Sequence, residues 1–211
     1  MQQAATAETL WILGDLFEAW LGDDIGDPAC APVVDALARL SDTGTALHLL
    51  HGNRDFLLGE AFATKTGATL HRDDEVIVEL SGEATLLLHG DTLCTGDTDY
   101  QSLRVMLRNP AWQRDFLAGT PAKRLDAARA LRERSREATA GKSGGIMDVD
   151  PDAVIAAFER SQCRTMIHGH THRPADHSTP AGRRLVLGDW HDDHAEIIRH
   201  EDSRFFLETW R

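Results

Sequence analysis

Four short apolar runs of this chain each lead directly into residue types that bind metal ions. The residues are Asp15 after 10–13, Asn53 after 47–51, His89 at the end of 86–89, and the pair His170 and His172 after 166–168. One carboxylate, one amide oxygen and three imidazoles suit a borderline divalent cation such as manganese, iron or zinc. Such a cation activates water and polarises a phosphate, so this ligand set predicts a metal-dependent phosphoesterase.

The runs before these residues are typical of buried strands. An apolar stretch of four to six residues that ends in glycine and a polar residue predicts a strand entering a loop. In a layered α/β fold, ligands bind beyond the carboxyl ends of the strands, so we expect the four loops to meet at one edge. Each motif alone is weak, because a Gly-Asp pair is a common turn and a single histidine often only packs in a core.

The rest of the chain alternates predicted strands and helices. Helices are expected over Pro32–Leu40 and Ala122–Ala138, and from Pro151, where Asp150 is a suitable N-cap. We therefore predict an α/β sandwich with a helical insertion over about residues 97–147. The strands are expected at 10–13, 46–50, 75–80, 85–89, 165–168, 185–187, 196–199 and 204–208, the last two as a hairpin.

The charge of the chain is unevenly distributed. The net charge is −12, which argues against general nucleic-acid binding, yet residues 100–145 contain ten basic and only four acidic residues. The same segment contains large apolar residues, among them Met106, Trp112 and Phe116. One interpretation is a solvated helical face with a small core of its own. The other, which we favour, is a cap that takes up an anionic lipid at a membrane surface.

The ordered motifs resemble the calcineurin-like metallophosphoesterases, a superfamily with a β-sandwich flanked by helices. Longer strings are similar to one branch of it, the UDP-2,3-diacylglucosamine hydrolase family. These strings are 14–20, 51–59, 89–95, 146–149 and 167–174, and the resemblance runs from about Leu10 to the C-terminus. It implies one domain over residues 1–211 with the insertion as a cap.

The resemblance also implies a reaction and a place. The family cleaves the diphosphate of a UDP-linked diacylated glucosamine and releases UMP and the acylated sugar phosphate, a step of lipid A biosynthesis in Gram-negative bacteria. It implies manganese as the cofactor and a peripheral position on the cytoplasmic face of the inner membrane. The three cysteines suit reduced thiols in a cytosol, and neither a secretory signal nor an apolar run of about 18 residues is present.

By family analogy, two metal ions share Asp15. Asn53, His89 and His170 complete one site, and His172 belongs to the other. The family carries an Asp-x-His motif on an earlier strand, whereas residues 1–13 contain neither aspartate nor histidine. We therefore expect one complete metal site in this chain and a second with too few ligands.

Further residues are implied as substrate contacts. Arg54 is expected to be catalytic, by neutralising charge on the attacked phosphate; the alternative is a surface salt bridge. His51, His168 and His191 either orient the ligands or pack in the ordinary way. Thr139 stands where the family has asparagine, and Asp97 and Ser135 could equally be a loop residue and a helix-face residue. The implied contacts are Asn53, Arg54, Asp97, Ser135, Thr139, Lys142 and His170.

Two other functions stay open. The chain could be a different metallophosphoesterase that acts on phosphoproteins or cyclic nucleotides, although the arginine-rich, apolar insertion speaks against this. It could also be an inactive or truncated chain without the first metal site.

Overall fold

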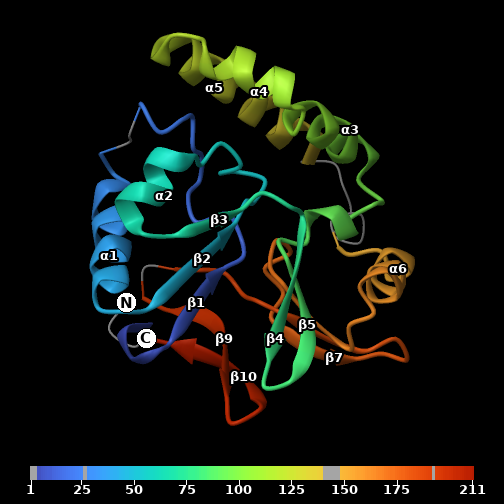
Figure 1. Cartoon of the computed structure of the whole chain (residues 1–211). Helices are drawn as coiled ribbons and strands as arrows, with labels where there is room; N and C mark the ends of the chain where they lie inside the picture. Colours follow the sequence, from blue (N-terminus) through green and yellow to red (C-terminus); the bar gives the residue numbers. More distant parts are fainter. Residues whose placement is uncertain (1–3, 26–27, 140–147, 192) are drawn as a thin grey trace. The chain divides into compact units, whose positions relative to one another are not determined.

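The computed structural model describes residues 4–25, 28–139, 148–191 and 193–211, except for the side chains of Ala5 and 135–139. The described chain divides into two compact units (Figure 1). The first comprises residues 4–72 and 98–139, and the second comprises 73–97 and 148–211. Each unit is described by itself below.

The first unit is built on a three-stranded parallel sheet in the order β1-β2-β3, and α1 and α2 pack on it (Figure 1). Leu47 and Leu49 alternate along β2 and enter the same core as Leu37 and Phe62. Because β1 and β2 are parallel, the loops that follow them emerge at the same edge of the sheet. The elements are η1 (Ala4–Thr6), β1 (Thr9–Ile12), α1 (Ala31–Asp42), β2 (Ala46–Leu50), α2 (Glu60–Thr66) and β3 (Thr69–His71).

The helical insertion belongs to this first unit. It consists of α3 (Thr98–Leu107), α4 (Pro110–Leu117) and α5 (Pro121–Thr139). The side chain of Asn109 accepts the backbone N–H groups of Ala111 and Trp112, so it caps α4, and Pro110 fits the first helical position. No residue of α3 or α4 is buried. The insertion therefore exposes much of its apolar surface.

The second unit contains a five-stranded sheet in the order β4-β5-β6-β8-β7, in which β5, β6 and β8 run parallel. Leu86, Leu88 and Met166 pack against Phe158 of α6 in its core. A separate antiparallel hairpin is formed by β9 and β10. The elements are β4 (Glu75–Leu80), β5 (Glu83–Leu88), η2 (Asp91–Leu93), α6 (Pro151–Ser161), β6 (Thr165–His168), β7 (Ala175–Ser178), β8 (Arg183–Val186), β9 (Ala195–Glu201) and β10 (Arg204–Trp210).

The predicted α/β class is confirmed, and all eight predicted strands are present within a few residues of their expected bounds. The three predicted helices correspond to α1, α5 and α6. The sequence analysis did not predict β3, β7 or α2. The single domain over residues 1–211 stays a prediction. Among the described residues, no helix combines the length and the apolar character needed to cross a bilayer.

Candidate metal centre

Asp15 lies in the loop after β1, against the loop that follows β2. One of its carboxylate oxygens accepts the backbone N–H of Arg54 at 2.9 Å. A Cβ atom on Gly52 would collide with the backbone nitrogen and carboxylate of Asp15, so only glycine permits this approach. The two loops of the first unit thus bring Asp15 beside the segment that carries Asn53 and Arg54.

The side chain of Asp55 connects the loop after β1 to the loop after β2. It is fully buried, and its carboxylate accepts the backbone N–H groups of Gly52 at 2.9 Å, Leu16 at 2.7 Å and Asp15 at 3.2 Å. A carboxylate that accepts several backbone donors holds their relative positions, because each donor lost would leave a buried polar group without its partner. Asp55 therefore fixes the backbone on which Asp15 stands.

Arg54 extends from the same loop and is exposed. Its Nε atom lies 3.5 Å from a carboxylate oxygen of Asp15, and its Nη1 donates to Glu18 at 2.7 Å. The carboxylates of Asp15 and Glu18 thus hold the Arg54 guanidinium in place, while it remains exposed to solvent. Such a group can contact an incoming anion without a change of backbone.

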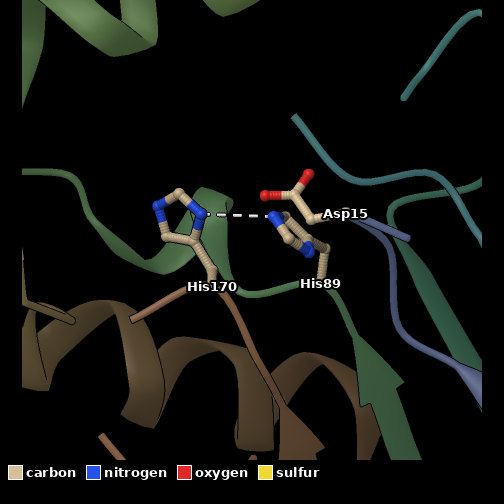
Figure 2. Close-up of side chains that lie close together, drawn as sticks. All are labelled: Asp15, His89 and His170. Atoms are coloured by element: carbon tan, nitrogen blue, oxygen red, sulfur yellow. Dashed lines mark hydrogen bonds between the residues drawn. The ribbon is translucent and has the colours of Figure 1, made fainter. Parts of the chain in front are cut away.

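His89 and His170 approach each other in the second unit, after β5 and β6. Nδ1 of His170 lies 3.2 Å from Nε2 of His89, and the rings meet edge to face with centroids 5.0 Å apart (Figure 2). The backbone N–H of Gly169 donates to the carbonyl of His89 at 2.9 Å and so ties the two loops together. Burial, aided by His89, lowers the pKa of His170 to about 3. The His170 ring is neutral at pH 7 and offers a lone pair, which is what a metal ligand needs.

His168 stands directly before this pair and is completely buried. Its Nδ1 lies 2.9 Å from the carbonyl of Gly169, and its Nε2 lies 2.9 Å from Nη1 of Arg184. Because a carbonyl only accepts and a guanidinium only donates, His168 is the neutral tautomer with its proton on Nδ1. Burial first, with Arg184 adding to it, lowers its pKa to about 4. His168 thus supports the backbone of the histidine loop.

His172 lies on the same loop, with its Nδ1 2.9 Å from a carboxylate oxygen of Asp189. Its backbone is left-handed, with φ of 52°, as are His170 at 64° and Asp15 at 54°. This conformation is uncommon outside glycine and costs of order 1–3 kcal/mol per residue. Strained residues concentrate at functional sites, and here they coincide with three predicted ligands.

The remaining predicted residues are placed as follows. Asn53 lies half-buried after β2, and Asp97 lies half-buried at the end of the loop after η2, where its N–H donates to Cys94 at 3.3 Å. Ser135 and Thr139 belong to the last turns of α5, but their side chains, like all of Lys142, lie outside the described residues. Their roles as substrate contacts stay predictions.

The histidines proposed to orient ligands differ in their surroundings. Nε2 of His51 lies 2.9 Å from the carbonyl of Leu58, and burial first, then Arg108, lowers the pKa of His51 to about 4. His51 is thus a neutral donor that shapes the loop after β2. His191 is exposed and stacks on His194 with ring centroids 4.4 Å apart. The contacts that hold His172 instead come from Asp189, which the sequence analysis missed, as it missed the role of Asp55.

Strand-end loops that carry aspartate, asparagine and histidine on an α/β scaffold define a metal-dependent phosphoesterase. Comparison with known proteins shows to which family of this class the chain belongs. The chain is 48% identical to a UDP-2,3-diacylglucosamine hydrolase of Chromohalobacter salexigens over 207 residues, which cover 96% of this chain and 83% of the relative. It is 49% identical over 194 residues to that of Cellvibrio japonicus, covering 90% and 80% of the two chains. The chain belongs to the UDP-2,3-diacylglucosamine hydrolase family.

Two solved structures are also similar, at low sequence identity. An archaeal phosphodiesterase has a TM-score of 0.46 and 13% identity, with 96% of this chain and 83% of that chain covered. Vacuolar protein sorting 29 from Cryptosporidium parvum has a TM-score of 0.43 and 11% identity, with 96% and 95% covered. No family model matches the chain.

Proposed function

We propose that this protein hydrolyses the diphosphate bond of UDP-2,3-diacylglucosamine, giving UMP and 2,3-diacylglucosamine 1-phosphate for lipid A biosynthesis. The observation that carries the proposal is the 48% identity to a UDP-2,3-diacylglucosamine hydrolase over 96% of the chain. The strand-end residues agree with it, because diphosphate hydrolysis needs an activated water and a way to neutralise phosphate charge.

The cofactor in this proposal is a divalent cation, with manganese as the physiological ion. By family analogy, Asp15, Asn53, His89 and His170 would hold one ion, and His172 would serve a second. The donor set fits, since it combines a carboxylate with an imidazole that burial keeps neutral. When bound, the metal acidifies water and polarises the phosphate.

The chain's own residues supply the rest of the chemistry. Arg54 is exposed, is held near Asp15 and is free to move from Glu18 to a phosphate oxygen, where it offsets the charge of the attacked group. Asp55 holds the backbone of both loops, so the backbone that carries Asp15 and Arg54 needs no rearrangement when the Arg54 side chain turns to the substrate.

The insertion is proposed to take up the acylated half of the substrate. Four of its large apolar side chains are exposed, namely Val105 by 74%, Met106 by 43%, Leu117 by 39% and Leu125 by 41%. Exposed apolar residues among arginines suit acyl chains that adjoin phosphates at a membrane surface. This supports a peripheral position on the cytoplasmic face of the inner membrane. The family resemblance adds Asp97, Ser135, Thr139 and Lys142 to the proposal as further substrate contacts.

The proposal is tested with the pure protein, UDP-2,3-diacylglucosamine in detergent micelles and manganese. We expect UMP release, and in ¹⁸O-labelled water the label in UMP, because the phosphorus next to uridine is the point of attack. His170→Ala should abolish manganese-dependent turnover and weaken manganese binding, whereas His177→Ala, an exposed histidine of β7, should not. Absence of UMP release by the folded protein, or label in the lipid phosphate, would contradict the proposal.

A further inference from the structure

Arg124 is the only charged side chain that is buried among the described side chains of the insertion, with 2% of its surface exposed. Its Nη1 donates to the carbonyl of Leu21 at 2.8 Å and to Asp24 at 2.8 Å, and its Nη2 donates to the other carboxylate oxygen of Asp24. The guanidinium therefore binds the carboxylate in bidentate fashion, the most directional form of this contact. Helix α5 is fastened here to residues 21–24.

Gly22 shows that residues 21–24 are shaped around this guanidinium. Its φ is +116°, and a Cβ atom there would collide with Nη1 of Arg124 and lie 2.8 Å from Cδ2 of Leu117. A side chain at position 22 would therefore be strained and would displace the insertion. The conformation of residues 21–24 therefore depends on the position of Arg124, which lies about a hundred residues later in the sequence.

The same stretch of chain also contacts the loop of the candidate site. The backbone N–H of Trp20 donates to the carbonyl of Arg54 at 3.1 Å. The carboxylate of Asp23 accepts the N–H groups of Gly59 at 3.0 Å, Ala61 at 2.9 Å and Phe62 at 3.0 Å, and so caps α2. Residues 15–24 therefore lie between the Arg54 loop on one side and α5 on the other.

A second contact joins α5 to this stretch nearer the site. Arg132 donates to the carbonyl of Glu18 at 3.1 Å, and the side chain of Glu18 accepts from Arg54 at 2.7 Å. Arg132 is exposed, so this contact alone is weak. The Arg124 pair is the stronger determinant of where α5 lies, because its guanidinium is buried, although the Asp24 side chain is 62% exposed.

We propose that Arg124 and Asp24 form a latch that holds the helical insertion in register with Arg54 and Asp15 and thereby sets the affinity for the acylated half of the substrate. The role of the latch in substrate affinity rests on the proposed function, whereas the register of α5 does not. Both are positioning residues, because neither needs to touch substrate. Nε of Arg124 is buried and has no hydrogen-bond partner among the described residues. Burying the guanidinium costs solvation that its contacts with Leu21 and Asp24 must offset, so the pair is weak evidence for a role in stability alone.

The test first removes the negative charge of Asp24 and then also removes the buried positive charge of Arg124. Asp24→Asn leaves the guanidinium without a counter-ion, so α5 should detach from residues 21–24. Adding Arg124→Met to it removes the stranded charge and should largely restore docking. We expect Asp24→Asn to raise KM for the diacylated substrate about tenfold, with unchanged kcat, and the double variant to recover most of this. Arg129→Met, on the same helix but 71% exposed, is the matched control.

Two further measurements keep the outcomes distinct. Turnover of bis(p-nitrophenyl) phosphate should be the same in all variants, and hydrogen exchange of the α5 amides should be faster only in Asp24→Asn. Equal losses on both substrates, or exchange in α5 that does not change, would overturn the latch. If the wild-type protein does not hydrolyse the lipid substrate, the proposed function fails. The effect of the Arg124–Asp24 pair on the position of α5 is still decided by hydrogen exchange of the α5 amides.

Discussion

Nδ1 of His172 and a carboxylate oxygen of Asp189 lie 2.9 Å apart, between the loops that follow β6 and β8. The other oxygen of Asp189 accepts the backbone N–H of Trp190 at 2.8 Å, which fixes the carboxylate. Burial acts to raise the pKa of Asp189, but the Trp190 N–H and His172 outweigh it and keep this pKa below its usual range. An ionised Asp189 accepts a hydrogen bond from Nδ1 of His172 and leaves Nε2 available to the metal ion that we propose this histidine binds.

Asp189→Asn should therefore weaken the binding of the ion that His172 is proposed to contact by about 10–100-fold, because the amide no longer fixes the orientation of the imidazole ring or raises its basicity. Titration with manganese followed by electron paramagnetic resonance measures this. Asp193→Asn, which alters an exposed carboxylate beside His194, is the control and should leave the affinity unchanged. Equal manganese affinity in wild-type protein and both variants would refute the role of Asp189.

Asp55→Ala should lower the free energy of unfolding by on the order of 3 kcal/mol, because it leaves three backbone N–H groups without their common acceptor. Urea unfolding monitored by tryptophan fluorescence measures the loss. Asp55→Asn keeps one acceptor oxygen and should lose less. Asp73→Ala, at an exposed position, should be nearly neutral. If Asp55→Ala were as stable as Asp73→Ala, these N–H groups would have other acceptors.

Most elements that carry the site could be predicted from local sequence. Leu86, Leu87 and Leu88 are all buried in β5, and such a continuous apolar run has few alternatives to a central strand. By contrast, β7 reads Ala-Asp-His-Ser and is a strand only because it pairs with β8, which no local pattern encodes. Strand β3 has a single strongly apolar residue, Leu70, and escaped prediction for the same reason.

The residue types of the site could be read from the sequence, but their supporting contacts could not. Asp55 is in the quoted motif after Asn53, yet its bonds to the Asp15 loop cross about 40 positions. Asp189 has no motif signal that separates it from nearby acidic residues. Arg124 was counted among the basic residues of a phosphate-binding cap, whereas the structure buries it against Asp24. Such pairings depend on tertiary contacts, which a single sequence does not encode locally.

Cys94 should resist alkylation at neutral pH. Burial first, with Asp91, Asp148 and Asp97 adding to it, raises the pKa of the Cys94 thiol to about 12. A raised thiol pKa means that the reactive thiolate is scarce at any pH well below 12. In the native protein at pH 8, iodoacetamide should label the partly exposed Cys30 and spare Cys94, as read by peptide mass spectrometry. Denatured protein should be labelled at both, and rapid native labelling of Cys94 would show that its site opens.

Arg54→Ala should lower kcat for the lipid substrate by about 10²–10³-fold, because it removes the donor that we propose offsets the developing phosphate charge. Arg54→Lys keeps the charge without the planar fork and should recover only part of this. Arg72→Ala, which removes an exposed arginine paired with Glu60, is the control. A change in KM alone would mean that Arg54 binds the ground state and the transition state equally.

Reversing charge on α5 should separate the lipid substrate from small ones. Arg132 and Arg134 belong to the basic stretch that is proposed to attract the phosphates of the substrate, so replacing both by glutamate should repel them. We expect kcat/KM for UDP-2,3-diacylglucosamine to fall about tenfold or more, and to fall less as salt is added, because added ions screen exposed charges.

Turnover of bis(p-nitrophenyl) phosphate should stay within about twofold of wild type, since attack on a small phosphodiester needs the candidate metal centre but not the cap. Lys65→Glu, an exposed reversal on α2, is the control for charge reversal outside the insertion. Equal losses on both substrates would assign the insertion to folding or to the metal centre and not to lipid uptake.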